Sequence, residues 1–261
     1  MWALLQMIAY SSDGMSSNSS LGGKSRENDA QILVKLLSDL ALILPCDACT
    51  KSYGKASDEA GLLRQVVTAL CAKTGFQTFS ELLYNRYATE LVYELHTRVN
   101  QKLATKTAED LYDSLQLSIS KETFVAEFLK HDATRQPPLY IVEKRFGIFS
   151  IETLNVDNTW ILLLALAQRC TTREQSAEVS LLASMTSLCC RRSKSMHLRE
   201  FAYHLDRACL AFQSPNSSVY ECMLQEYLGF TCGPDCKLSR QSVEGRLRMM
   251  TSSACTPFSC H

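Results

Sequence analysis

Apolar residues recur along most of the chain at intervals of three and four, the spacing that gathers them on one face of an α-helix. This pattern predicts a first helix at residues 2–10. Residues 11–28 are rich in Ser, Gly and Asn, so we expect a loop there. Asn28 or Asp29 can then cap a second helix at residues 30–44.

Pro45 interrupts the helical pattern after this second helix. Proline disfavours helical backbone in the residue before it and suits the first turn of a new helix. We therefore expect one helix to end before Pro45 and a short one to begin there, with Cys46 in its first turn. Gly54 should end the short helix, and residues 57–75 form a further apolar helical stretch.

A helix start is signalled at Thr78, because Glu81 stands three residues later and the two can form a capping box. The apolar pattern after it predicts one long helix at residues 79–104. Two shorter helices are expected to follow, capped at Thr107 and Ser120.

The helical pattern breaks at residues 132–158, which contain Pro137-Pro138 and read as a linker or a short hairpin. We therefore predict an all-α protein with two helical units. The expected divisions are a first helical bundle at 1–131, the linker, a second helical domain at 159–229, and a Cys-rich tail at 230–261.

The second unit resembles the first in two places. Residues 160–167 share Trp, two Leu and Ala with residues 2–9, and Val219-Tyr220-Glu221 repeats Val92-Tyr93-Glu94. Cys189-Cys190 falls roughly where the first unit has a Cys pair. A degenerate duplication is one interpretation; chance similarity between amphipathic helices is the other.

The composition of the chain indicates no particular class of binding partner. Apolar residues make up 46% of the chain, and 27 basic residues balance 27 acidic ones, which gives no basic patch for a nucleic acid. The longest apolar run, residues 160–167, is much shorter than the ~20 residues of a membrane span. No cationic residue precedes the short apolar stretch after Met1, so we expect neither a signal peptide nor a membrane anchor.

Twelve cysteines are present, and the pair in Cys46-Asp47-Ala48-Cys49 has a spacing with known chemistry. Cys-x-x-Cys serves zinc sites, thioredoxin-like folds and flavin-linked oxidases. Zinc would need two more ligands, yet the next cysteine is Cys71 and the next histidine His96. A thioredoxin-like site follows a strand, whereas a helix is predicted here. Redox chemistry at a helix start is therefore favoured, because the backbone N–H groups there stabilise a thiolate.

Three segments in order resemble the Erv/ALR family of FAD-linked sulfhydryl oxidases, of the kind also encoded by large DNA viruses. Residues 2–9 are similar to the family's Trp-x-x-Leu-His helix, with Gln6 where His is usual. Leu44-Pro45-Cys46-Asp47-Ala48-Cys49, followed by Tyr53, resembles its Tyr-Pro-Cys-x-x-Cys motif. Residues 95–103 resemble its His-Asn-x-Val-Asn-x-x-Leu helix, with Thr97 replacing Asn.

The resemblance implies an FAD-binding four-helix bundle that oxidises protein thiols through Cys46 and Cys49 and passes the electrons to oxygen. Trp2 and His96 would pack on cofactor rings, with Gln6 in the place of the usual His. The residues implied in cofactor binding are Trp2, Gln6, His96, Asn100, Lys102 and Lys106.

The resemblance also bears on partners and location. It implies a homodimer inside an infected host cell, in the cytoplasm or nucleus, and also in the virion. A second Cys pair that shuttles electrons is expected in the tail, where a structural disulfide is the alternative; the candidates are Cys232, Cys236, Cys255 and Cys260. The competing functions are a non-enzymatic helical structural or interaction protein associated with the virion, and a zinc-binding helical module.

Overall fold

The computed structural model describes residues 1–14, 22–44, 50–51, 53–54, 61–104, 150–232, 243 and 245. Within these residues all regular structure is helical, with nine α-helices, two short 3-10 helices and no strand. The prediction of an all-α protein is therefore confirmed.

The helices fall into two sets along the chain. The first set comprises α1 (Trp2–Asp13), α2 (Gly22–Asp39), the 3-10 helix η1 (Leu40–Leu42), α4 (Leu62–Thr74), α5 (Phe79–Tyr84) and α6 (Ala88–Ala104). The second set comprises the 3-10 helix η4 (Ile151–Thr153), α9 (Val156–Arg169), α10 (Arg173–Arg191), α11 (Met196–Phe212) and α12 (Val219–Cys232).

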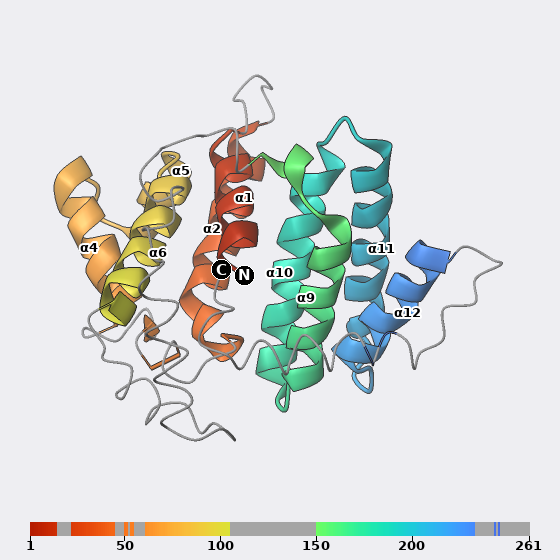
Figure 1. The fold of residues 1–261 in the computed structure, drawn as a ribbon. Helices are drawn as coiled ribbons and strands as arrows, with labels where there is room; N and C mark the ends of the chain where they lie inside the picture. Colours follow the sequence, from red (N-terminus) through yellow and green to blue (C-terminus); the bar gives the residue numbers. More distant parts are fainter. Residues whose placement is uncertain are drawn as a thin grey trace.

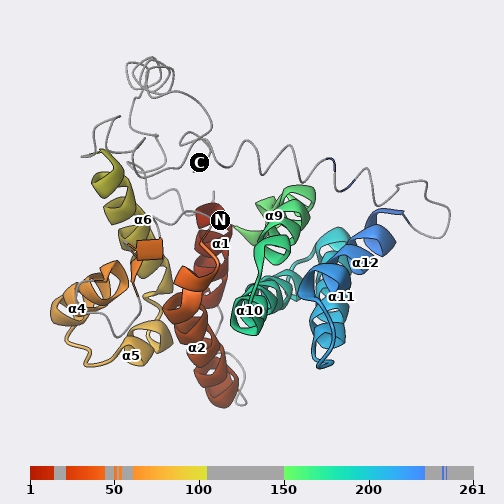
Figure 2. The ribbon, with the colours of Figure 1, turned by 90° about the horizontal axis from the view of Figure 1, so that it is seen from below.

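The helices stand side by side, with α1 and α2 in the middle of the molecule (Figure 1). On one side α1 packs against α6 and α2 against α5, while α4 contacts both α5 and α6. On the other side α10 contacts α1, α2 and η1, and it also packs against α9, α11 and α12. Figure 2 shows the same order from below, with α10 between the red α2 and the blue α11. Helix α10 therefore joins the two sets.

Leucines from every long helix fill the core, because each helix buries the apolar face that its sequence predicts. In the second set the centre is Trp160, which is fully buried. Its ring lies 5.2 Å from the Phe201 ring and 5.7 Å from the Tyr227 ring, centroid to centroid. Aromatic pairs at these separations add to the burial energy.

The capping box at Thr78 is confirmed, since Thr78 Oγ1 accepts from the Glu81 N–H and the Glu81 side chain accepts from the Thr78 N–H. The prediction of one helix over 79–104 is wrong. Helix α5 ends at Tyr84, and Arg86 adopts a positive φ of 70° before α6 begins. A left-handed residue cannot continue a right-handed helix, so the chain turns here.

The loop predicted at 11–28 is also wrong in part. Helix α1 continues to Asp13, and α2 begins at Gly22, so Asn28 and Asp29 lie inside a helix rather than at its cap. Asp29 instead pairs with Arg192, with 3.4 Å between Oδ2 and Nη2. Tertiary contacts thus outweigh the weak local preference of a polar sequence for a loop.

Glycines end helices where the sequence predicts. Gly75 has φ 81° and its N–H donates to the Cys71 carbonyl, which closes α4. Gly54 has φ 67° and its N–H donates to the Thr50 carbonyl, which ends a helical turn. Glycine reaches this left-handed region without strain.

Several predictions lie outside the described residues: the helix start at Pro45, the caps at Thr107 and Ser120, and residues 132–149 of the linker. The remainder of that linker contains η4, and α9 begins at Val156 with Asn155 as its cap. The division into domains stays a prediction. None of the helices in the described ranges is long and apolar enough to cross a membrane.

Candidate functional site

The candidate site lies where α1 and α6 run antiparallel. At one end of this pair Asp13, the last residue of α1, caps α6 from outside: its carboxylate oxygens accept from the Ala88 N–H at 3.1 Å and the Thr89 N–H at 2.7 Å. A carboxylate at a helix N-terminus satisfies free N–H groups and opposes the helix dipole. This contact fixes the register of α1 on α6, and so places Trp2 and Gln6 beside His96.

Trp2, Gln6 and His96 meet at the other end. The indole of Trp2 stacks on the His96 imidazole, with ring centroids 5.0 Å apart and 12° between the planes. Gln6 Nε2 lies 3.3 Å from His96 Nδ1, in hydrogen-bonding distance. Gln6 and His96, which are 90 positions apart in sequence, thus lie in one cluster with Trp2. This proximity is what one cofactor bound by all three residues would need.

The cluster is largely dry. Gln6 is 5% exposed and His96 is 6% exposed, whereas Trp2 is half-buried. Burial lowers the pKa of His96 to about 4, and the positive charge of the chain's amino group adds to this effect. His96 is therefore neutral at physiological pH, and one of its ring nitrogens can accept a hydrogen bond while the other donates.

A flat cofactor ring can fit this cluster on one side only. Stacked rings need about 3.5 Å between their faces, so a ring inserted between Trp2 and His96 would require about 7 Å. The observed 5.0 Å leaves no such space. Trp2 is half-buried, so part of its indole remains accessible for a ring to stack on, while His96 covers one face of the indole and is itself held by Gln6.

The other predicted residues are not placed beside this cluster. Asn100 and Lys102 belong to α6, which continues to Ala104, but their side chains are outside the description. The same holds for the side chain of Cys232 at the end of α12. Outside the described residues altogether lie Cys46, Cys49, Lys106, Cys236, Cys255 and Cys260.

Two residues near the Cys46–Cys49 segment, Leu44 and Tyr53, are described. Leu44 lies two residues after the end of η1. Tyr53 is fully buried, and its hydroxyl donates to the Leu37 carbonyl of α2 at 2.6 Å. Burial, with a smaller contribution from the charge of Glu178, raises the pKa of Tyr53 above its ordinary value. The aromatic residue of the resemblance therefore anchors the chain after the Cys pair.

Glu178, on α10, is a functional candidate that sequence analysis missed. It is 2% exposed, and its Oε1 atom has no hydrogen-bond partner among the described residues. When it is ionised, its negative charge raises the pKa of Lys35 and of Tyr53. The signal was present in the sequence: Glu178 stands four and seven positions before Leu182 and Met185, in phase with the buried face of α10.

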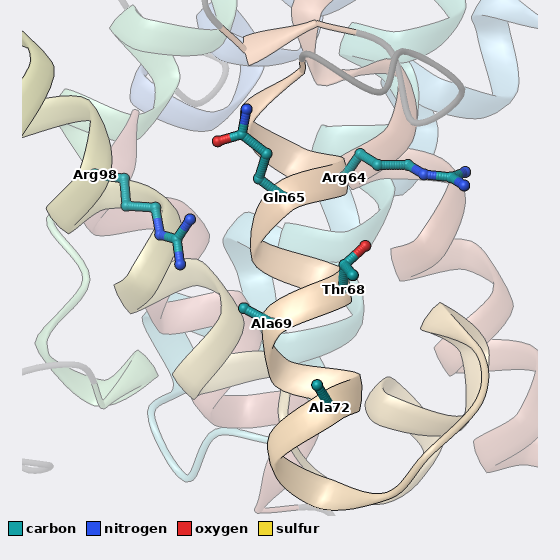
Figure 3. A pocket seen from close by; sticks show the side chains of 6 residues that line it. All are labelled: Arg64, Gln65, Thr68, Ala69, Ala72 and Arg98. Atoms are coloured by element: carbon teal, nitrogen blue, oxygen red, sulfur yellow. The ribbon is translucent and has the colours of Figure 1, made fainter.

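A separate groove opens between α4 and α6, with a volume of about 520 Å³. Its lining consists of Arg64, Gln65, Thr68, Ala69, Ala72 and Arg98. Figure 3 shows Arg98 reaching from α6 toward α4, whereas Arg64 points away from it. The two guanidinium groups therefore do not converge on one anion, and the floor of the groove is formed by small side chains.

The cysteines whose side chains are described are free thiols: Cys71, Cys170, Cys189, Cys190, Cys209 and Cys222. Cys189 and Cys190 are completely buried, and burial raises their pKa to about 11 and about 12. Thiols of this kind are protonated and unreactive at neutral pH. In the described part of the chain, no group of three His, Cys, Asp or Glu side chains is arranged to hold a metal ion.

Comparison with known proteins assigns no family. No family model matches the chain, no curated protein is similar to it, and no solved structure matches its fold.

Proposed function

We propose that the protein is a flavin-dependent sulfhydryl oxidase that forms disulfides in protein substrates. One observation supports this most directly: Trp2, Gln6 and His96, which the motif resemblance selects from segments far apart in sequence, meet in one cluster. The Cys46–Cys49 pair enters the proposal from the sequence, where its spacing and its place after Pro45 favour redox chemistry.

The proposed reaction begins with the Cys46–Cys49 disulfide. A substrate thiolate attacks the Cys46 sulfur; a bond between substrate and Cys46 forms, the Cys46–Cys49 bond breaks, and Cys49 leaves as a thiolate. A second substrate thiolate then attacks the substrate sulfur of this mixed disulfide, which releases Cys46 and gives the substrate disulfide. Two thiols and one oxygen molecule become one disulfide and one hydrogen peroxide.

The cofactor's part is limited to electron transfer. When bound, FAD supplies the two-electron acceptor through which the Cys46–Cys49 dithiol is reoxidised at the expense of oxygen. The chain would contribute the surface of Trp2, a neutral His96 and the Gln6 amide, which fixes the imidazole orientation. Asn100, Lys102 and Lys106 are the proposed partners for the rest of the cofactor.

We also infer that the second helical unit is a degenerate copy of the first. In each set the helix that carries the Trp-bearing motif packs against the helix that carries Val-Tyr-Glu: α1 on α6, and α9 on α12. Around Trp160, however, the rings of Tyr227 and Phe230 occupy the space beside the indole. This second unit accordingly is proposed to hold no cofactor.

The test is whether the purified chain carries flavin and consumes oxygen. We expect flavin absorbance, oxygen uptake with dithiothreitol as the thiol, and an equivalent yield of hydrogen peroxide. Cys49→Ser should abolish uptake and leave flavin bound, while Cys71→Ser, a free thiol on α4, should retain activity. Trp2→Ala should lose flavin, and the exposed aromatic Tyr84→Ala should not.

Two outcomes would refute the proposal. A colourless protein that neither binds added FAD nor consumes oxygen is not an oxidase, and the helical interaction protein then becomes the better interpretation. Full turnover in Cys49→Ser would exclude the reaction given above.

A further inference from the structure

The methionine side chains differ greatly in exposure within the described part of the chain. Met185 and Met223 lie in the core at 1% and 0% exposed, and Met1 and Met7 are half-buried. Met196, the first residue of α11, is 74% exposed. A peroxide converts a thioether to a sulfoxide, and to do so it must reach the sulfur. Among the described methionines, Met196 is therefore the one that an oxidant in solution reaches most easily.

The sulfur of Met196 has a charged neighbour. Arg199 stands three residues later on the same face of α11, and its Nη2 donates to Met196 Sδ at 2.8 Å. Within the ranges that the structure describes, Arg199 has no ion-pair partner. A thioether sulfur is only a weak acceptor, so a guanidinium directed at it is poorly satisfied. An oxygen placed on this sulfur would be a better acceptor for the same donor.

We propose that Met196 is a site of reversible oxidation by hydrogen peroxide, at which Arg199 binds first the peroxide and then the sulfoxide oxygen. The sulfur attacks one peroxide oxygen: an S–O bond forms, the O–O bond breaks, and the proton on the transferred oxygen passes to the departing hydroxide, which gives water. The sulfur loses two electrons and the peroxide gains them. Arg199 donates to the departing oxygen, where negative charge develops.

Oxidation at this position is compatible with the fold. The sulfoxide of Met196 stays in water, whereas at Met185 or Met223 it would place a polar oxygen in the core. Burial keeps the thiols of Cys189 and Cys190 protonated, with their pKa well above the ordinary value, so they react slowly with peroxide. Met196 thus consumes peroxide without loss of structure, and a methionine sulfoxide reductase restores it.

The contact with Arg199 should also make the reaction stereoselective. The sulfur of a sulfoxide is chiral, and an exposed methionine without a directing neighbour gives both epimers in similar amounts. A peroxide held by Arg199 delivers its oxygen from one side of the sulfur, so one epimer should predominate. The two classes of methionine sulfoxide reductase each reduce one epimer and so distinguish them.

The first test is the rate of oxidation at each methionine. The full chain is treated with hydrogen peroxide, quenched with catalase, digested with trypsin and analysed by mass spectrometry. Trypsin cuts after Lys194 and Arg199, so residues 195–199 form a peptide whose only methionine is Met196. We expect Met196 to be oxidised at least tenfold faster than Met185 and Met223, which react only after local opening. Equal rates would overturn the proposal.

The second test isolates the contribution of Arg199. Arg199→Leu should slow the oxidation of Met196 about threefold or more, because one charged hydrogen bond is lost. Arg64→Leu, which removes an exposed guanidinium of α4, is the matched control and should oxidise Met196 at the native rate. Arg199→Lys keeps one charged donor and should recover part of the rate. Native oxidation rates in Arg199→Leu would show that exposure alone governs Met196, and would overturn the role of Arg199.

The third test measures the two epimers. The sulfoxide of the native protein should be reduced almost entirely by one class of reductase, and that of Arg199→Leu by both classes to a similar extent. Similar reduction of the native sulfoxide by both classes would overturn the proposal. The proposed oxidase would produce hydrogen peroxide, but these tests supply it directly. Their outcome therefore does not depend on oxidase activity, and the two proposals fail separately.

Discussion

The buried carboxyl group of Glu178 should make the stability of the folded protein fall as pH rises. Glu178 is 2% exposed at the contact of α10 with α2, and its Oε1 atom has no hydrogen-bond partner in the described part of the chain. Burial raises its pKa to about 8; the negative charge of Asp39 adds to this, and the positive charge of Lys35 opposes it. At neutral pH the group is therefore mostly protonated.

The size of the effect follows from the two pKa values. In the unfolded chain Glu178 titrates near its ordinary 4.5, and in the folded chain near 8. Between these values the folded state binds more protons than the unfolded state, so the free energy of unfolding decreases with pH. At about 1.4 kcal/mol for each factor of ten in proton affinity, the loss is about 3 kcal/mol at pH 7 and about 5 kcal/mol above pH 9. The contribution is fully present below pH 4.5.

The variant that isolates this contribution is Glu178→Gln, which keeps the shape and removes the titration. Urea unfolding in dithiothreitol at pH 5, 7 and 9 gives the free energy of unfolding for both proteins. We expect the variant to gain on the native protein by about 3 kcal/mol or more from pH 5 to pH 9. Glu174→Gln, an exposed glutamate in the first turn of α10, is the control and should show a nearly constant difference.

A constant difference between the native protein and Glu178→Gln at the three pH values would refute this reasoning. It would mean that the carboxyl group has the same pKa in the folded and unfolded chains, and hence that it is hydrated or paired in the folded state. If the difference in free energy of unfolding from the native protein rises with pH for both variants, the effect comes from the electrostatics of α10 as a whole.

Three further substitutions test single contacts by the free energy of unfolding. Asp13→Ala removes the cap of α6 and should cost about 1–2 kcal/mol. Tyr53→Phe removes the hydroxyl that donates to the Leu37 carbonyl and should cost about 1–3 kcal/mol, since a buried acceptor loses its partner. Arg173→Ala removes the guanidinium that lies 4.0 Å from the Phe212 ring centroid and donates to carbonyls at the α11–α12 turn, at a cost of about 1–2 kcal/mol.

Each of these contacts has its own control. Asp13→Asn retains an acceptor for α6 and should recover part of the loss, so equal losses would show that capping is not the cause. Tyr84→Phe, on an exposed tyrosine, should be neutral where Tyr53→Phe is not. Arg173→Lys keeps the charge without the planar fork; if it is as stable as the native protein, the stacking and the multiple hydrogen bonds contribute nothing.

Helix ends with a local cause were predictable from the sequence, and those with a distant cause were not. Thr78 with Glu81, and Gly75, act through neighbouring backbone groups, and the structure has both ends as predicted. The start of α6 depends on Asp13, 75 residues away, and nothing near Ala88 announces it. The sequence therefore suggested one long helix where the chain forms two.

The candidate site was predictable only through the motif resemblance. Periodicity alone makes Trp2 and His96 core residues of two unrelated helices; the motif is what associates them, and the structure brings them into contact. Glu178 shows the reverse case, because it breaks the polarity pattern of α10 yet belongs to no motif. A single charged residue on the apolar face of a helix is easily taken as a sign that this part of the face is exposed to solvent.

The contacts of α10 argue that the first helical unit does not stand alone. Helix α10 covers α1, α2 and η1, and two polar contacts reinforce it: the Cys189 thiol with Ser11, and Arg192 with Asp29. Residues 1–131 expressed alone would leave this face of α1 and α2 in water. We expect this fragment to be digested by trypsin at least tenfold faster than the full chain, with residues 1–232 as the matched control that retains α10. Equal resistance of both fragments would show that residues 1–131 are an independent domain, and that the second unit supports neither α2 nor the Tyr53 anchor beside the Cys pair.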